Sequence, residues 1–298
     1  MNAMINQASG LSYMVRQLSS NDLEPRTRRQ PAAIAITSGK GGVGKTNVVV
    51  NLAVSLANLG KRVLILDADF GLANIDVLLG LAPRHNVRDF IFGDSALEDV
   101  VVDEPDGVRI IPASSGVEQL ASLTTQQQMK LIRGLTQLSE DIDYLLIDTA
   151  AGISANVINF LLAAGLVMVV TTPEPTSIVD AYLMVKILAH RESRKRVSIL
   201  VNSVSGKEEA LHVHHQIDLV SRQFLSRPLE LFGYIEKDRN VGEAVRFQTP
   251  FVKLFPNSVA SKRMNGLAKK LHDYCEQRRS MNDMDVWWDS LFSTARPC

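Results

Sequence analysis

Residues 32–60 read AAIAITSGKGGVGKTNVVVNLAVSLANLG, and three segments of different character follow one another in this stretch. Residues 32–37 are apolar except for the last, which is typical of a strand buried on both faces of a sheet. Residues 38–46 form a glycine-rich loop, and residues 47–59 have the spacing of a helix that ends at Gly60. The stretch therefore predicts a strand, a loop and a helix.

The alternation of apolar runs and helical segments continues along the chain. The runs with the strand pattern are AAIAIT (32–37), RVLILD (62–67), VRIIPA (108–113), YLLIDT (144–149), LVMVVTT (166–172), VSILVN (197–202) and LELFGYI (229–235). Strands separated by helices predict a doubly wound, mainly parallel sheet with helices on both faces. The predicted fold class is therefore α/β.

Composition divides the chain into four parts. Residues 1–18 carry a helical stripe of apolar side chains, and residues 19–31 are polar, with two prolines and three arginines. Residues 32–255 hold the strand–helix alternation. Residues 256–298 hold two amphipathic stripes, the first rich in lysine and arginine and the second, at 281–292, rich in aspartate. We predict an N-terminal helix, a linker, one domain and C-terminal amphipathic helices.

Charge and cysteine content argue against several classes of protein. The chain has 298 residues, with 32 Lys and Arg against 32 Asp and Glu, and its two cysteines are Cys275 and Cys298. The balanced charge gives no global field for nucleic acid, so nucleic-acid binding is not expected. Two cysteines near the C-terminus fit a reducing compartment better than a disulfide framework. The sequence shows neither a signal peptide nor a membrane-spanning run, so we expect a cytoplasmic protein.

The glycine-rich loop satisfies the phosphate-binding pattern GxxxxGK[ST]. Its residues are Gly39, Lys40, Gly41, Gly42, Val43, Gly44, Lys45 and Thr46. Glycines let backbone N–H groups surround phosphate oxygens, and the N-terminus of the following helix adds partial positive charge. We expect Lys45 to contact the β- and γ-phosphates and the Thr46 hydroxyl to bind Mg²⁺.

Three aspartates at strand ends offer acidic groups for a metal. YLLIDT contains Asp148, and RVLILDADFG contains Asp67 and Asp69. Asp67 and Asp69 are two positions apart, so their side chains would point to the same face if the strand continued through both, and this holds only if the strand has not ended before Asp69. Any of the three could instead cap the helix that follows. We expect Asp148 and Asp67 to belong to the Mg²⁺ shell with Thr46, and Asp69 to place the attacking water.

The base of the nucleotide is expected to be adenine. Guanine-specific GTPases carry an Asn-Lys-x-Asp motif, in which the aspartate binds guanine. The segment VSILVNSVSG (197–206) has Asn202 but no aspartate three residues later. An amide can serve adenine because it donates and accepts hydrogen bonds at once. We therefore predict ATP rather than GTP, with Asn202 at the base.

Together these segments resemble the deviant Walker A ATPases of the MinD/ParA type. The resemblance rests on the loop with Lys40, on LDADFGLANIDVLLG (66–80) and on IDTAAG (147–152), and it covers residues 32–255. It implies the P-loop NTPase fold of the SIMIBI class and slow, Mg²⁺-dependent ATP hydrolysis. Lys40 corresponds to the signature lysine, which in that family reaches the ATP of the partner subunit. The resemblance thus implies an ATP-dependent homodimer in which Lys40, Lys45 and Asp69 are catalytic.

Two further segments resemble the FlhG (FleN) family of MinD-like regulators of flagellar number. TTPEPTSIVDAY (171–182) is similar to its EPTSxxDAY stretch, and NQASGLSYMVRQ (6–17) is similar to its DQAxxLR activator helix. Asn6 stands where that helix has aspartate, and Ser12 where it has arginine. The resemblance implies that residues 1–18 act on an FlhF-like GTPase of the SRP type. It also implies flagellar C-ring proteins and a transcription activator as partners.

The resemblance places two more residues beside the base. Many relatives have GVIPxD there, whereas this chain reads GYIEKD at 233–238. Ile235 and Glu236 therefore take the positions expected at the adenine pocket. A glutamate cannot stack on the base as a proline does, although backbone contacts are unaffected by the change.

Other functions within the same superfamily stay open on the sequence alone. A MinD-like septum-site regulator normally ends in a basic amphipathic helix, whereas residues 281–292 contain no lysine or arginine. A ParA-like partition ATPase needs a basic DNA-binding surface, for which the cluster at 262–270 is available. The basic stripe at 259–278 fits transient contact with the inner face of the cell membrane, or packing on the protein itself.

Overall fold

The computed structural model describes residues 31–70, 74–103, 107–113 and 123–279, and in them one sheet of eight strands in the order β3-β4-β2-β5-β1-β6-β7-β8. The strands are β1 (Ala32–Thr37), β2 (Val63–Ala68), β3 (Val102–Asp103), β4 (Val108–Ile111), β5 (Tyr144–Thr149), β6 (Leu166–Thr171), β7 (Val197–Val204) and β8 (Glu230–Glu236). Every neighbouring pair is parallel except β3 and β4. The predicted α/β fold with a mainly parallel sheet is confirmed.

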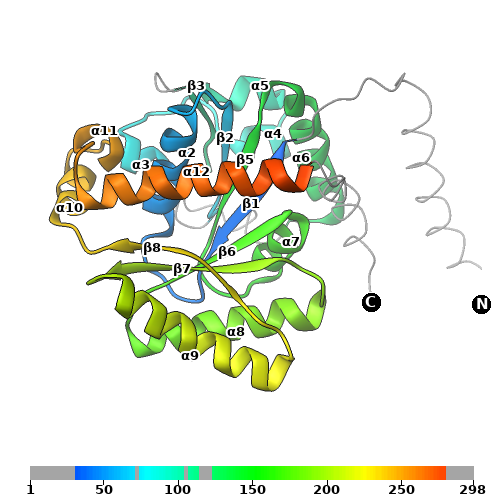
Figure 1. The fold of residues 1–298 in the computed structure, drawn as a ribbon. Helices are drawn as coiled ribbons and strands as arrows, with labels where there is room; N and C mark the ends of the chain where they lie inside the picture. The colour runs from blue at the N-terminus through cyan, green and yellow to red at the C-terminus, as the bar shows by residue number, and fades with distance from the viewer. Residues whose placement is uncertain (1–30, 71–73, 104–106, 114–122, 280–298) are drawn as a thin grey trace, which may run out of the picture.

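Helices connect the strands and cover the sheet (Figure 1). They are α2 (Lys45–Ala57), α3 (Ile75–Leu79), α4 (Val87–Phe92), α5 (Leu97–Val100), α6 (Thr125–Leu138), α7 (Ala155–Ala163), α8 (Pro175–Arg191), α9 (Lys207–Leu225), α10 (Arg239–Arg246), α11 (Phe251–Leu254) and α12 (Val259–Arg279), with a 3-10 turn η2 (Ser139–Asp141). In Figure 1, β6, β7 and β8 lie between α12 on one side and α8 and α9 on the other.

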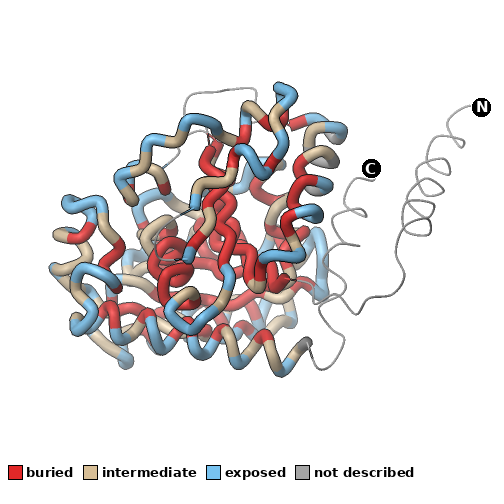
Figure 2. The backbone as a smooth tube through the Cα atoms, turned by 90° about the horizontal axis from the view of Figure 1, so that it is seen from above, coloured by how far each residue is buried: buried red, intermediate tan, exposed pale blue. Residues whose placement is uncertain are grey.

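The sheet is buried on both faces because its side chains alternate between two cores. Ile34 and Ile36 of β1 belong to the core that includes α2 and α12, whereas Ala33 and Ala35 belong to the core that includes α7, α8 and α9. Figure 2 shows the buried strands enclosed by helices whose outer faces are exposed. Burial on both faces explains why the predicted strand runs are apolar at successive positions.

Helix α12 packs on this body through the first of the two predicted C-terminal stripes. Met264, Leu267 and Leu271 are buried in the core that α2 also contributes to. Lys270 donates from Nζ to the carbonyl of Phe232 in β8 at 2.6 Å. The apolar side of α12 is therefore occupied by the protein in this structure.

No helix in the described part of the chain has the length and apolar character needed to cross a bilayer.

The N-terminal helix predicted at 1–18, most of the linker at 19–31 and the stripe at 281–292 lie outside the described residues. Their predicted structures stay predictions.

The register of the central strands gathers the predicted site at one edge of the sheet. Asp148 in β5 lies opposite Asp67 in β2 and Ile36 in β1. Strand β1 ends at Thr37, directly before the glycine-rich loop. Because parallel strands present their carboxyl ends at the same edge, the loop and the two aspartates meet there.

Candidate functional site

The glycine-rich loop turns sharply between β1 and α2, and two of its glycines are required by the geometry. Gly44 has a φ of 89° and immediately precedes Lys45, the first residue of α2. A Cβ atom at Gly44 would lie 2.5 Å from Nδ2 of Asn202, and one at Gly39 would lie 2.4 Å from the carbonyl oxygen of Asp180. Glycine accepts both the left-handed backbone and the close approach. The N-terminus of α2 therefore opens toward the loop, as a phosphate site needs.

Lys45, Thr46 and Asp148 form the buried centre of the site. Lys45 is 8% exposed, and burial lowers the pKa of its ammonium group while Asp148 and Asp69 act in the opposite direction. The Thr46 side chain hydrogen-bonds Asp148. Burial raises the pKa of Asp148 to about 7, although Thr46 and Lys45 favour the ionised carboxylate. A neighbouring cation therefore offsets part, and not all, of the cost of burying this carboxylate.

One oxygen of Asp148 has no protein partner. Its Oδ1 atom is buried without a hydrogen bond, although the described interior satisfies most of its polar atoms. Buried polar atoms are almost always paired, so an orphaned carboxylate oxygen beside a threonine hydroxyl and a lysine indicates a cation that binds there. Magnesium prefers oxygen ligands of this kind. The residues at this position fit a Mg²⁺–nucleotide complex.

Asp67 and Asp69 differ because strand β2 ends between them, at Ala68. Asp67 is 1% exposed, and burial and the nearby Asp148 raise the pKa of its carboxyl group well above the ordinary value. The backbone N–H of Asp69 donates to Oδ1 of Asp67 at 3.0 Å. Asp69 itself lies in the lining of an open cavity next to the glycine-rich loop. The sequence left open whether the strand had ended before Asp69, and the structure shows that it has.

A cavity of about 850 Å³ adjoins the loop. Its lining residues are Gly41, Gly42, Gly44, Lys45, Thr46, Asn47, Asp69, Asn74, Val77, Leu78, Ala150, Ala151, Val245, Arg246 and Gln248. The polar side chains among them come from the start of α2, from Asp69 after β2, from Asn74 before α3, and from Arg246 and Gln248 at and after the end of α10. A cavity of this size accommodates a nucleotide-sized ligand. No sequence motif marks Asn47, Asn74, Arg246 or Gln248, so none of these four residues was predicted.

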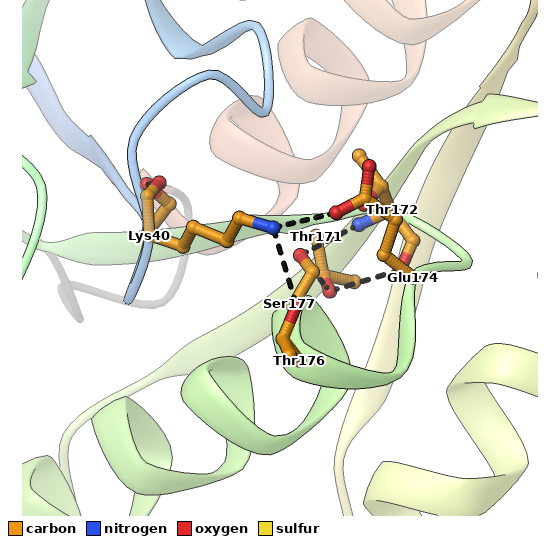
Figure 3. A network of polar contacts seen from close by, with 7 residues as sticks. Lys40, Thr171, Thr172, Glu174, Thr176 and Ser177 are labelled. Atoms are coloured by element: carbon orange, nitrogen blue, oxygen red, sulfur yellow. Dashed lines mark hydrogen bonds and ion pairs between the residues drawn. The ribbon is translucent and has the colours of Figure 1, made fainter.

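The side chain of Lys40 points toward the start of α8 (Figure 3). Its Nζ lies 2.5 Å from Oε2 of Glu174 and 3.1 Å from Oγ1 of Thr176. The turn that presents these partners is held by Ser177, whose Oγ accepts from the backbone N–H of Thr172 at 3.1 Å. The side chain of Lys40 is 37% exposed and that of Glu174 is 64% exposed. The segment EPTSIVDAY, noted above only for its family resemblance, therefore also supplies the partner of Lys40.

The three residues predicted at the base are spread over different environments. Asn202 donates from Nδ2 to the carbonyl of Val43 at 2.8 Å, and its Oδ1 accepts from the N–H of Ser203 at 2.9 Å, so its amide holds the glycine-rich loop. Ile235 is a buried core residue. The Glu236 carboxylate pairs with the guanidinium of Arg263. None of the three lines the cavity described above, and their assignment to an adenine pocket stays a prediction.

Comparisons with known proteins agree with this geometry. Residues 32–199 match the protein family described as AAA domain. The chain is 43% identical to the antiactivator FleN of Pseudomonas aeruginosa over 241 residues, which cover 81% of this chain and 86% of FleN. It is 34% identical to the flagellum site-determining protein YlxH of Helicobacter pylori over 89% of this chain and 90% of YlxH.

Solved structures extend the comparison to the fold. The cell division ATPase MinD of Pyrococcus furiosus superposes with a TM-score of 0.69 at 25% identity, over 82% of this chain and 99% of that one. MinD of Pyrococcus horikoshii in complex with Mg-ADP gives a TM-score of 0.68 at 26% identity, over 81% and 96%. The chain therefore belongs to the MinD/ParA-type family of P-loop ATPases, and within that family it is similar to the antiactivator FleN and the flagellum site-determining protein YlxH.

Proposed function

We propose that this ATPase is a dimerising molecular switch that hydrolyses ATP slowly and regulates the number or placement of flagella. The observation that carries the proposal is the 43% identity to the antiactivator FleN over most of both chains. The second relative, YlxH, carries flagellar site determination in its name. An antiactivator opposes a regulatory protein, so the expected output is control of a partner rather than bulk turnover of ATP.

The residues of the buried centre divide the work of phosphate binding and hydrolysis. Lys45 and the loop amides hold the β- and γ-phosphates, while Thr46, Asp67 and Asp148 hold the metal. Magnesium supplies neutralisation of charge on the phosphate oxygens. Asp69 lies past the end of β2 in the cavity, where it orients the attacking water. Catalysis of this kind is mostly positioning and electrostatic stabilisation.

ATP is the proposed nucleotide, with Asn202, Ile235 and Glu236 near the adenine. The support is the lack of an aspartate three residues after Asn202, which would pair with guanine. Competition of ATP and GTP for a fluorescent nucleotide tests the preference. Displacement by GTP at lower concentration than ATP would overturn it.

Lys40 is proposed to act on the ATP bound by a second subunit. The support is its position: Lys40 belongs to the phosphate loop, yet its ammonium group turns to Glu174 instead of the cavity. An exposed ion pair of this kind contributes little, so exchange of Glu174 for a phosphate is accessible at small cost. ATP then joins two subunits, and its hydrolysis separates them.

The proposed partners are an FlhF-like GTPase, flagellar C-ring proteins and a transcription activator, and transient membrane contact is proposed for the C-terminal segment. Residues 1–18 are assigned to the GTPase on their resemblance to the activator helix. A pull-down of the FlhF-like GTPase with the full chain and with a chain that starts at Pro31 tests this. Equal capture by both chains would reject a role for the N-terminal segment.

Septum-site regulation is the second candidate, favoured by the superposition on MinD structures. Identity to MinD of Bacillus subtilis is 32% over 80% of this chain, below the identity to FleN. Deletion of residues 1–20 in cells separates the two functions. Altered flagellar number without minicells supports the flagellar function, whereas minicells support septum-site regulation. ATP-dependent, salt-sensitive binding to non-specific DNA would instead favour a ParA-like partition function.

A further inference from the structure

We propose that Gln248 is a nucleotide-positioning residue. It fastens α3 to the end of α10, two segments that line the cavity, and thereby slows the release of bound nucleotide. Gln248 lines the same cavity as Lys45 and Thr46. The inference rests on the nucleotide site alone and is independent of the proposed flagellar function.

The backbone at Gln248 is one where glycine is the usual residue. Helix α10 ends with the N–H of Gln248 bonded to the carbonyl of Val245 at 3.0 Å and the N–H of Thr249 bonded to the carbonyl of Ala244 at 3.1 Å. This pair of bonds is the Schellman arrangement, whose residue after the C-cap adopts the left-handed conformation. Gln248 has a φ of 49°. A glutamine here adopts a conformation that glycine adopts without strain. A hydrogen bond of its side chain compensates for this strain.

The glutamine side chain makes a bond between distant parts of the chain. Its Nε2 donates to the carbonyl oxygen of Val77 at 2.7 Å, across 171 residues of sequence. Val77 belongs to α3, and both residues line the cavity. Gly80 follows the end of α3, and a Cβ atom added there would lie 3.5 Å from the Cβ of Gln248, so the two segments pass close to each other. The bond therefore fastens α3 to the end of α10, and both segments line the cavity.

Helix α3 is also connected to the metal side of the cavity. The backbone N–H of Ile75, its first residue, hydrogen-bonds the carboxylate of Asp67. Asn74 and Leu78 on either side of Ile75 line the cavity as well. A displacement of α3 would therefore open the wall and disturb Asp67 together. Gln248 holds α3 in place through its bond to Val77. Through α3 it therefore also affects the position of Asp67.

Release of mant-ADP in the presence of Mg²⁺, measured on the full chain by stopped-flow fluorescence, tests the proposal. Gln248→Gly removes the side chain and relieves the left-handed backbone, so part of the stability lost with the bond to Val77 is offset and the variant should fold. Its release rate should rise by about threefold to tenfold, the range expected for one hydrogen bond. Gln248→Glu keeps the length but replaces the donor with an acceptor, so it should also release faster.

Ser226→Gly provides the matched control. Ser226 has a φ of 51° at the end of α9, and it is not among the residues that line the cavity. This variant relieves a left-handed backbone as Gln248→Gly does, while its release rate should stay at the wild-type value. Release from Gln248→Gly at the wild-type rate overturns the proposal. So does equal acceleration in Ser226→Gly.

Discussion

The two lysines of one loop lie in opposite environments. Lys45 is 8% exposed and lies near the buried Asp148, whereas the side chain of Lys40 is 37% exposed and pairs with a surface glutamate. Charges interact strongly where water is excluded and weakly where it is not. The buried surroundings of Lys45 therefore favour tight binding of a ligand in one position. The exposed surroundings of Lys40 allow it to exchange Glu174 for another partner. The predictions below test this contrast between a buried centre and an exposed rim.

Lys45→Ala should produce the largest effect. It removes the cation that faces the phosphates, and loss of charge-assisted hydrogen bonds should weaken nucleotide binding by about 100-fold or more. Titration with mant-ATP in the presence of Mg²⁺ measures the affinity. Lys40→Ala is the matched variant and should change the affinity of the monomer by less than about threefold. Similar losses in the two variants would remove the contrast.

Asp148→Asn should abolish most Mg²⁺-dependent hydrolysis, by roughly 100-fold, because one ligand of the metal shell is lost. It should also change the pH dependence of stability. The pKa of Asp148 is about 7 in the folded, nucleotide-free protein and 3.8 in a free side chain, so the folded state retains its proton over a range in which the unfolded state has lost it.

The free energy of unfolding of the wild type should therefore fall relative to that of Asp148→Asn as pH rises from about 4 to 7, by at most about 4 kcal/mol. Above pH 7 the difference should stay constant, and below pH 4 it should not change further. Urea unfolding at several pH values measures it. Parallel pH profiles for the two proteins would show that burial does not raise the pKa of Asp148.

Gly44→Ala tests the rigid end of the loop against its open end. The added Cβ would approach Asn202 to 2.5 Å at a φ of 89°, whereas a Cβ at Gly41 meets nothing within 4 Å. Gly44→Ala should lower the free energy of unfolding by about 1–3 kcal/mol. Gly41→Ala should change it by less than about 0.5 kcal/mol. Thermal unfolding of the nucleotide-free variants gives both values, and equal losses would contradict the geometry.

Glu174→Ala should have a small effect on stability. Its pair with Lys40 is exposed, so the free energy of unfolding should fall by less than about 1 kcal/mol. The same change frees Lys40, and the ATP-dependent dimer should form at lower protein concentration. Size-exclusion chromatography with light scattering measures the dimer. A loss of dimer in Glu174→Ala would show that this glutamate supports association instead of competing with it.

Much of the fold could be predicted because its strands are buried on both faces. Apolar runs such as YLLIDT match the observed strand β5 at both ends. The antiparallel edge strand β3 was missed, because Val102 and Asp103 are only two residues and one is exposed. The helix predicted at 47–59 begins at Lys45 and ends at Ala57, since the loop continues directly into its first turn.

The candidate site was predictable where a local pattern carries the chemistry. The glycine-rich loop and the strand-end aspartates follow from short motifs, and the parallel register then brings Asp67 and Asp148 together. Contacts between distant segments carry no such pattern. Lys40 and Glu174 are 134 residues apart, and Gln248 and Val77 are 171 apart, so only the fold reveals these pairs.

The most direct test of the central claim is sedimentation velocity of Asp69→Ala with Mg²⁺ and ATP, alone and combined with Lys40→Ala. Asp69→Ala should bind ATP without hydrolysing it and sediment as a dimer, because the state that joins two subunits is retained. The double variant should bind ATP and remain a monomer, because Lys40 is the group that reaches the second subunit. An Asp69→Ala protein that binds ATP and stays monomeric, or a double variant that still dimerises, would contradict the account.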